Sequence, residues 1–304
     1  MRDLLKKENK PCITVFTATY NRQKLLERAY VSLCEQTRKE FVWLIVDDGS
    51  TDETQKQVEM WQREADFEIY YVYQENGGKM RAHNRGVQLT ETELFVCLDS
   101  DDTLTRNAVE RLTDSWQGIP AEKKQRYAGM IAYKGRDEEY TLNGELFPEV
   151  EADSLTGLEQ KGFRGETVLV LRTEILREFL FPEFDGENFV PEAVVYDRID
   201  RKYQYKVIPE IFMVCEYQPD GLTRRIAQLR NDNPRGWLLY YQQRIEQSEK
   251  SLLRYKYQVH AVCFAWKLHA PIHEAVPGNT VERLAALPAA VLLRCMRTVS
   301  YTHL

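Results

Sequence analysis

The sequence predicts an α/β protein with a mostly parallel sheet flanked by helices, followed by a helical C-terminal extension. Short, β-branched apolar runs alternate with segments of helical period through the first half of the chain. The loops between them are short, which favours parallel strands joined by right-handed helical crossovers. From residue 234 onward the pattern is almost continuously helical. We therefore expect one domain over residues 1–230 and a helical extension over 231–304.

Four strand and helix pairs are expected in the first half. The strands are predicted at residues 13–20, 41–50, 68–74 and 93–99. The helices are predicted within residues 22–37, 50–65, 76–89 and 105–116. Ser50 or Thr51 is the expected N-cap of the second helix, and glycines open the third.

The middle of the chain mixes strand and helix patterns. A strand is predicted within residues 126–144, a strand that enters a helix at 166–176, and further strand material at 206–221. Residues 187–203 predict a short helix with Pro191 near its first turn. The helical stretch that begins at 234 is expected to stop at Pro271.

Composition and charge narrow the function classes. A formal net charge of −6 over 304 residues argues against a general nucleic-acid binder. Six scattered cysteines without a CxxC pair indicate thiols in a reducing cytoplasm. The charged N-terminus predicts no secretory signal, and no apolar run is long enough to span a membrane. Residues 284–297 form an apolar segment that ends in arginines, either a packed helix or a membrane-surface contact.

Polar residues follow three of the predicted strands. Ligands bind outside the carboxyl ends of the strands in sheets of this kind, so the three polar loops are expected to gather at one edge. Asp47 and Asp48 end the second strand and precede Gly49. An ordinary Asp-Gly turn explains this block, but Asp48 is also placed to accept hydrogen bonds from a base or a ribose hydroxyl. The helix N-terminus behind it would tolerate a nearby phosphate.

The fourth strand ends in Asp99, Ser100, Asp101 and Asp102. A solvated acidic turn is one interpretation. The other is a divalent cation, because clustered carboxylates repel one another unless a positive charge lies between them. Mg²⁺ and Mn²⁺ take one or two carboxylates together with substrate phosphate oxygens. Such an ion would offset the charge of a diphosphate leaving group.

Two further segments carry candidate functional residues. In residues 76–86 two glycines precede Lys79 and Arg81, which would either form a solvated basic face or reach a diphosphate; the spacing is not that of a Walker A loop. Glu192 has apolar neighbours that would suit it to general-base work on a hydroxyl, with a surface glutamate as the alternative. Pro271 separates His269 from His273 and argues against a metal pair there.

Taken together and in order, these segments resemble an inverting family-2 glycosyltransferase with the GT-A, Rossmann-like, nucleotide-diphospho-sugar transferase fold. The resemblance covers roughly residues 11–220. It is carried by the segments TVFTATYNR, LIVDDGSTDET, NGGKMRAHNRG and LFVCLDSDD, followed by FRGETVLVLRTEIL and FVPE.

The resemblance implies a role for each matching residue. The nucleotide pocket would be lined by Thr17, Thr19, Tyr20, Asn21 and Arg22. Asp48 would recognise the base, most often uracil in this family, with Asp47 beside it. Asp99, Ser100 and Asp101 match the DXD motif: Asp99 near the ribose and metal, Asp101 as the direct ligand of Mg²⁺ or Mn²⁺. Glu192 falls at the position of the base that deprotonates the acceptor hydroxyl.

Two positions depart from the family pattern. His83 replaces the arginine common in relatives, so the contacts of this helix with the phosphate or sugar of the donor substrate are expected to differ. Ala193 replaces the second acid of the usual Glu-Asp pair, so either Glu192 acts alone or Asp197 is the base.

Residues 217–230 resemble the segment that closes over the donor, with Arg224 and Arg225 available to the diphosphate. The expected function is metal-dependent transfer from a nucleotide-diphosphate sugar, most commonly a UDP-sugar, to a saccharide or lipid-linked acceptor. The expected place is the cytoplasm, with peripheral contact at the inner face of the membrane as a further expectation. A nucleotidyltransferase would require a glycine-rich GxGxRL signature, which TATYNRQKL lacks. A noncatalytic binding protein on a degenerate transferase scaffold stays an alternative.

Overall fold

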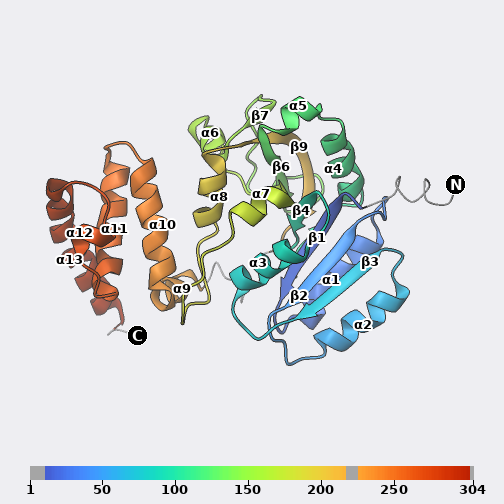
Figure 1. The fold of residues 1–304 in the computed structure, drawn as a ribbon, viewed down its shortest axis with the longest axis horizontal. Helices are drawn as coiled ribbons and strands as arrows, with labels where there is room; N and C mark the ends of the chain where they lie inside the picture. The colour runs from blue at the N-terminus through green and yellow to red at the C-terminus, as the bar shows by residue number, and fades with distance from the viewer. Residues whose placement is uncertain (1–10, 217–224, 302–304) are drawn as a thin grey trace. The chain divides into compact units, whose positions relative to one another are not determined.

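The computed structural model describes residues 11–216 and 225–301, with side chains described as far as residue 294. The chain divides into two compact units (Figure 1). One contains Met1–Leu180 and Val195–Pro219, and the other contains Phe181–Val194 and Asp220–Leu304. The helical extension therefore includes residues 181–194, which the expected boundary at 230 had assigned to the first domain.

The four predicted strand and helix pairs are present, and their strands are parallel. The strands are β1 (Ile13–Thr19), β2 (Val42–Asp47), β3 (Glu68–Tyr73) and β4 (Leu94–Cys97). The helices are α1 (Gln23–Cys34), α2 (Thr54–Glu64), α3 (Lys79–Leu89) and α4 (Ala108–Gln117). The sheet order is β3-β2-β1-β4-β8-β6-β9-β5, with β7 paired to β9.

The second half of the sheet is mixed. Its strands are β5 (Thr103–Leu104), β6 (Tyr127–Gly135), β7 (Ala152–Asp153), β8 (Thr167–Arg172) and β9 (Gln204–Val214). β8 runs antiparallel to both β4 and β6, whereas β6 and β9 are parallel. The helices among them are α5 (Ala121–Lys124), α6 (Leu155–Gln160), α7 (Thr173–Glu178) and α8 (Ala193–Asp200). The strands and helices predicted in this region are confirmed.

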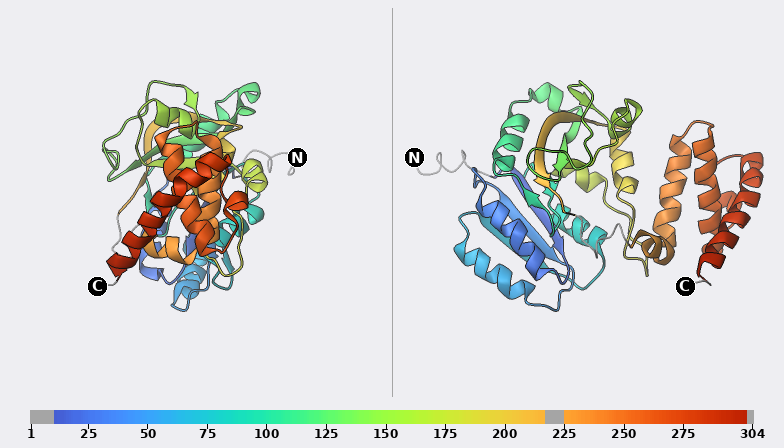
Figure 2. Two further views of the ribbon diagram at one scale, coloured as in Figure 1. Left: turned by 90° about the vertical axis from the view of Figure 1, so that its left-hand side faces the viewer. Right: turned by 180° about the vertical axis from the view of Figure 1, so that it is seen from behind.

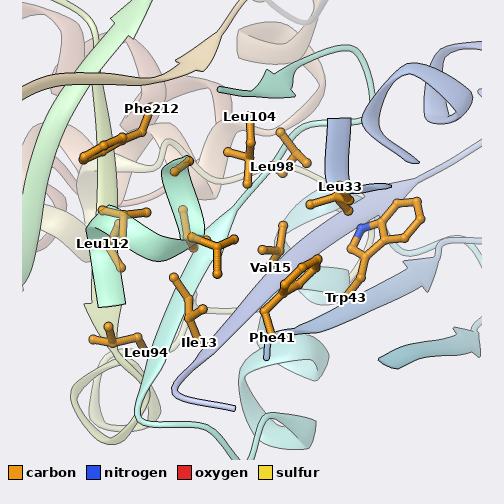
Figure 3. Packing of buried hydrophobic residues seen from close by; sticks show 14 of the residues in the cluster. Ile13, Val15, Leu33, Phe41, Trp43, Leu94, Leu98, Leu104, Leu112 and Phe212 are labelled. Carbon is orange, nitrogen blue, oxygen red and sulfur yellow. The ribbon is translucent and has the colours of Figure 1, made fainter. Parts of the chain in front are cut away.

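One face of the parallel strands carries the main apolar core (Figure 3). Because side chains alternate along a strand, Val15 and Trp43 point to this face, and α1, α2 and α4 add their buried leucine, valine and tryptophan side chains. The Trp43 indole donates a hydrogen bond to Thr17 Oγ1 at 3.0 Å, and Thr17 donates to the carbonyl of Leu98 at 2.8 Å. These bonds join β1 to β2 and to the residue that follows β4, inside the core.

The other face of the parallel strands is covered by α3. Phe16 and Phe95 stack there with ring centroids 5.1 Å apart, and the His83 ring meets both edge-on. Gly86 lies against the Phe16 ring so closely that a Cβ would stand 2.3 Å from a ring carbon. The absence of a side chain at Gly86 therefore sets the distance of α3 from the sheet.

The start of α2 differs from the sequence expectation. The N-cap is Glu53, not Ser50 or Thr51, which lie in the preceding loop. The Asp52 carboxylate accepts hydrogen bonds from the backbone N–H of Thr54 at 3.1 Å and from its hydroxyl at 2.6 Å. Asp52 therefore satisfies one of the free N–H groups of the first turn, which a hydroxyl at residue 50 or 51 was expected to do.

The second unit consists of helices around their own apolar cluster. They are α9 (Ile226–Asp232), α10 (Pro234–Gln247), α11 (Leu252–Lys267), α12 (Ile272–Ala275) and α13 (Thr280–Tyr301). Within this unit α11 packs against both α10 and α13, and it lies between them in the right-hand view of Figure 2. The predicted stop at Pro271 is confirmed, since α11 ends at Lys267. Among the described residues no helix has the length and apolarity needed to cross a bilayer.

The cysteines agree with the expectation of thiols. None of the five described cysteines forms a disulfide, and each is partly buried. They are Cys12, Cys34, Cys97, Cys215 and Cys263.

We predict that Gly86→Ala destabilises the protein although alanine favours helix. The gain in helix propensity is about 1 kcal/mol, but the new methyl group overlaps the buried Phe16 ring, and overpacking costs about 1–3 kcal/mol. Urea unfolding is expected to show a lower free energy of unfolding for Gly86→Ala than for Gln88→Ala, an exposed position on the same helix. Equal stability of the two variants would contradict the close approach.

His83 predicts a dependence of stability on pH. Burial, together with the smaller effect of the Lys79 charge, lowers the pKa of His83 to about 3, although Asp99 opposes the shift. Between this pKa and the ordinary value of 6.5 the unfolded chain binds more protons than the folded one, so stability falls as pH drops below about 6.5. The loss at pH 5 is on the order of 2 kcal/mol.

The comparison variant for this effect is His83→Leu, which cannot take up a proton. Its unfolding free energy is expected to fall less than that of the wild type between pH 7 and pH 5. His273→Gln, at an exposed histidine, serves as the control and is expected to keep the wild-type slope. The same slope for all three proteins would show that His83 does not control acid sensitivity.

Candidate functional site

The carboxyl ends of β1, β2 and β4 meet at one edge of the sheet, as the sequence predicted. Thr19 pairs with Asp47 across β1 and β2, and Phe16 pairs with Cys97 across β1 and β4. The loops that follow these strands therefore lie side by side. They contain the candidate nucleotide, base and DXD residues, and the N-terminus of α3 joins them through Lys79.

The turn after β4 brings two carboxylates against two cations. It closes with a hydrogen bond from the backbone N–H of Asp102 to the carbonyl of Asp99 at 3.0 Å. Lys79 Nζ lies 2.8 Å from Asp99 Oδ1. Arg22 Nη1 lies 3.1 Å from Asp101 Oδ2. The structure thus brings together four residues predicted from separate segments of the sequence.

The third acid of this turn, Asp102, faces inward. Its side chain is 8% exposed, and Lys134 Nζ lies 3.7 Å from Oδ2. The Cys215 thiol donates a hydrogen bond to the same oxygen at 3.1 Å. Lys134 and Cys215 come from the ends of β6 and β9, and sequence reasoning assigned no site role to either. The available signal was weak: Lys134 is the single cation in an otherwise apolar strand.

Burial and the surrounding charges shift the pKa values of Asp99 and Asp102 in opposite directions. Burial raises the pKa of Asp99, but Lys79, Lys134 and Arg22 outweigh it and hold that pKa at about 2. The pKa of Asp102 is raised to about 6, mainly by burial and further by Asp99, although Lys134 opposes the shift. Asp99 is therefore ionised at neutral pH and available to a cation.

Asp99 and Asp101 suit a divalent metal that also binds a ligand. They supply hard oxygen donors at a partly exposed strand end, which is the chemistry that Mg²⁺ and Mn²⁺ prefer. Among residues 11–216 and 225–301, no group of three or more His, Cys, Asp or Glu side chains is placed to hold a metal ion. An ion at this turn would therefore take further oxygens from phosphate or water, as Mg²⁺ commonly does.

Asp48 organises the glycine loop that precedes α3. Its side chain is 4% exposed. One carboxylate oxygen accepts hydrogen bonds from Gln74 Nε2 at 2.7 Å and from the Gly77 N–H at 2.9 Å. The other accepts from the Gly78 N–H at 2.7 Å and from Asn76 Nδ2 at 3.2 Å. A base bound to Asp48 would have to replace one of these donors.

Asp47 is also engaged inside the protein. It accepts a hydrogen bond from the Ser50 N–H at 2.7 Å and from the Tyr71 hydroxyl at 2.6 Å. Burial, followed by this bond, raises the pKa of Tyr71, so the phenol remains a donor. Asp47 therefore holds the loop after β2 in place beside Asp48.

The predicted pocket residues in the last part of β1 are buried, whereas Tyr20, which follows the strand, is exposed. Thr17 is fully buried, with its hydroxyl bonded to the neighbouring strands, so it supports the edge from within. Thr19 is 3% exposed, and its Oγ1 has no hydrogen-bond partner among the described residues. Tyr20 is 49% exposed, which leaves its ring accessible to a ligand. Ser100, in the acidic turn, is buried.

Asn21 ties the loop after β1 to the loop after β2. Its backbone has φ 51°, and asparagine tolerates this left-handed conformation better than most residues. Its N–H donates to Ser50 Oγ at 2.8 Å, and its Oδ1 accepts from the Thr51 N–H at 2.8 Å. This brace places the next residue, Arg22, beside Asp101.

The remaining predicted residues lie in several places. Arg81 donates from Nη1 to the Gly77 carbonyl at 2.8 Å and so folds back on the glycine loop. His83, whose replacement of arginine raised a question about donor contacts, is buried between aromatic rings. Arg224 lies outside the described residues, whereas Arg225 is exposed at the start of α9.

Glu192 lies directly before α8, in the unit that contains the C-terminal helices. Its side chain is exposed, so the expected apolar environment is wrong. The alternative base, Asp197, is partly buried within α8 and belongs to the sheet unit.

Comparison of the sequence with known proteins identifies the family of this chain. The family described as "Glycosyl transferase family 2" matches residues 14–165. The GalNAc(5)-diNAcBac-PP-undecaprenol beta-1,3-glucosyltransferase of Campylobacter jejuni is 34% identical over 222 residues, which is 70% of this chain and 67% of that protein. An uncharacterized glycosyltransferase of Nostoc sp. is 28% identical over 174 residues, and this chain spans about half (53%) of its length.

Solved structures show the same fold. Staphylococcus aureus TarS 1-349 in complex with UDP-GlcNAc has a TM-score of 0.54 at 18% identity, covering 92% of this chain and 80% of that one. The mannosyltransferase PcManGT from Pyrobaculum calidifontis, in complex with GDP-Man and Mn²⁺, has a TM-score of 0.55 at 20% identity, covering 97% and 81%. The fold is GT-A, and the chain belongs to glycosyl transferase family 2.

Proposed function

We propose that this enzyme transfers a sugar from a UDP-sugar to a hydroxyl acceptor, with inversion at the anomeric carbon and with Mg²⁺ or Mn²⁺ as cofactor. The observation that carries the proposal is the acidic turn after β4, where Asp99 and Asp101 each face a cation from another element. A metal–diphosphate complex requires negative groups for the metal and positive groups for the phosphates, and this turn has both. The binding of UDP-GlcNAc by TarS and of GDP-Man with Mn²⁺ by PcManGT supports it.

The acidic turn would hold the metal through Asp99 and Asp101. A bound divalent ion would neutralise negative charge on the diphosphate leaving group. Lys79 and Arg22 pair with the same carboxylates in the structure. On donor binding their side chains can turn to the diphosphate, which keeps the total charge at this edge balanced. Arg81, Ser100 and Arg224 are proposed as further donor contacts.

The nucleotide would lie across the ends of β1 and β2. Asp48 is proposed to accept a hydrogen bond from the base in exchange for one of its present donors, with Asp47 holding the loop. The exposed ring of Tyr20 offers an apolar surface for the nucleotide. The buried Oγ1 of the neighbouring Thr19 could accept a hydrogen bond from the ligand. Thr17 and Asn21 would contribute through the bonds that fix this edge.

Glu192 is proposed as the base, with Asp197 as the alternative. Its carboxylate would take the proton of the acceptor hydroxyl. The acceptor oxygen then forms a bond to the anomeric carbon as the bond from that carbon to the diphosphate oxygen breaks, and the leaving UDP takes the electron pair. Because attack and departure occur on opposite faces, one displacement inverts the configuration.

The acceptor is proposed to be a saccharide in cell-surface polysaccharide or lipid-linked oligosaccharide synthesis at the inner face of the membrane. The name of the Campylobacter relative, which contains an undecaprenol-linked saccharide, supports a lipid-linked acceptor. Residues 234–304 contain nine Lys and Arg against four Asp and Glu, although the whole chain is negative. Helix α13 exposes the apolar side chains of Val281, Leu284, Val291 and Leu292. A basic, partly apolar surface of this kind suits anionic lipid.

Vesicle flotation tests this contact. We expect the protein to float with phosphatidylglycerol-containing vesicles and much less with phosphatidylcholine alone, because the attraction is partly electrostatic. Raised salt is expected to weaken the binding. Absence of flotation with both vesicle types would remove the membrane contact from the proposal.

Asp101→Ala tests the metal and donor assignment. The variant is expected to lower Mn²⁺-dependent release of UDP from a UDP-sugar by about 100-fold, because a preorganised charge at the leaving group is lost. The assay uses UDP-glucose, UDP-galactose and UDP-GlcNAc, with GDP-mannose as the comparison donor and EDTA to remove metal.

The matched control is Asp114→Ala, which removes an aspartate paired with Arg38 on the surface. It is expected to keep the wild-type rate. Unchanged release by Asp101→Ala would remove the metal assignment. Wild-type protein that binds UDP with Mn²⁺ but releases none from any donor would favour the noncatalytic binding protein.

A further inference from the structure

The segment before Glu192 is fastened to the N-terminus of α10. Residues 185–192 and α10 belong to the same compact unit. Val190 and Pro191 are buried, whereas Glu192 is exposed. A segment whose last two residues before Glu192 are buried therefore ends in an exposed carboxylate.

Asn233 makes the first attachment. It occupies the N-cap position of α10, but its side chain does not cap that helix. Instead, Oδ1 accepts hydrogen bonds from the backbone N–H groups of Asn188 at 2.8 Å and Phe189 at 2.9 Å. Its Nδ2 donates to the carbonyl of Leu229 at 2.8 Å, and the residue is 4% exposed.

Glu187 makes the reciprocal attachment. Its carboxylate accepts hydrogen bonds from the N–H of Arg235 at 2.7 Å and of Gly236 at 3.0 Å. These are free donors in the first turn of α10, and Pro234 before them has no N–H. Glu187 thus caps α10 in place of Asn233. Asn233, at the N-cap position, instead holds the backbone of the segment before Glu192. A carboxylate at this end is also favoured by the helix dipole.

Close packing completes the attachment. The Phe189 ring stacks on Trp237 with centroids 6.2 Å apart. Gly236 lies so near that a Cβ would stand 2.8 Å from the Phe189 carbonyl oxygen and 3.2 Å from a Val190 methyl group. The segment and the first turn of α10 therefore fit without spare room.

We propose that Asn233, together with Glu187, is a positioning residue that sets the place of Glu192 for proton abstraction. Only Val190 and Pro191 separate the anchored Phe189 from Glu192. Both are buried, and the proline restricts its own backbone and that of the residue before it. A shift at Asn188 and Phe189 is therefore passed on to Glu192. This inference rests on the proposed role of Glu192 as the base.

The test compares Asn233→Ala with Asn233→Asp, which keeps the accepting oxygen. Mn²⁺-dependent release of UDP from the best UDP-sugar, with water as acceptor, gives kcat and the donor KM. Asn233→Ala is expected to lower kcat about tenfold or more, since small displacements of a reacting group cost up to about 100-fold. The donor KM is expected to stay within about twofold, and Asn233→Asp to recover most of kcat.

A matched control distinguishes a general loss of stability from a displacement of Glu192. Ser251→Ala removes a cap from α11 in the same unit, where Ser251 Oγ accepts from the Arg254 N–H at 3.2 Å. It is expected to lower Tm without lowering kcat. Gly236→Ala is the second variant, because its methyl group displaces the Phe189 carbonyl while alanine favours the helix; it is expected to lower kcat as well.

Glu192→Gln, assayed alongside, tells the two proposals apart. If it loses activity while Asn233→Ala and Gly236→Ala behave like Ser251→Ala, the positioning role is overturned and the base assignment stands. If Glu192→Gln keeps the wild-type kcat, both are overturned.

Discussion

Charge compensation at the turn after β4 is the constraint on which the carboxyl edge of the sheet depends. Three carboxylates within four residues would repel one another. Asp99 and Asp101 are each faced by a cation from another loop or helix, and Asp102 by Lys134 from β6. Because these cations come from separate elements, holding them also fixes those elements around the turn. The negative charge of the turn is thus balanced by the protein's own cations.

Hydrogen bonds to backbone groups shape the neighbouring part of the edge. Asp48 holds the glycine loop through two main-chain N–H groups, and Asn21 joins the loops after β1 and β2 in the same way. Main-chain donors have fewer alternative positions than long side chains, so this edge is preorganised. The same device recurs in the helical unit, where Asn233 and Glu187 exchange capping bonds.

Much of the fold follows from local pattern. The four parallel strands are short apolar runs, and the rule that ligands bind at the carboxyl ends of parallel strands places the acidic turn beside Arg22 and Lys79. What sequence reasoning missed depends on contacts between distant residues. Cys215 reaches Asp102 across 113 positions, and nothing local to either residue signals it.

One expectation drawn from local sequence was wrong. Glu192 has apolar neighbours in sequence, yet those neighbours point inward and leave the carboxylate exposed. Burial of neighbours along the chain does not bury the residue between them.

The order of synthesis has a consequence for the acidic turn. A nascent chain that has just completed β4 already contains Arg22 and Lys79, so the two outer acids can be neutralised early. Lys134 lies on β6, which is joined to β4 through β8, whereas Cys215 directly follows β9. Asp102 therefore gains the neighbouring charge of Lys134 after β8 has been made, and the hydrogen bond from Cys215 after β9. The four parallel strands can pair during translation, but the contacts of the acidic turn are complete only when β9 is in place.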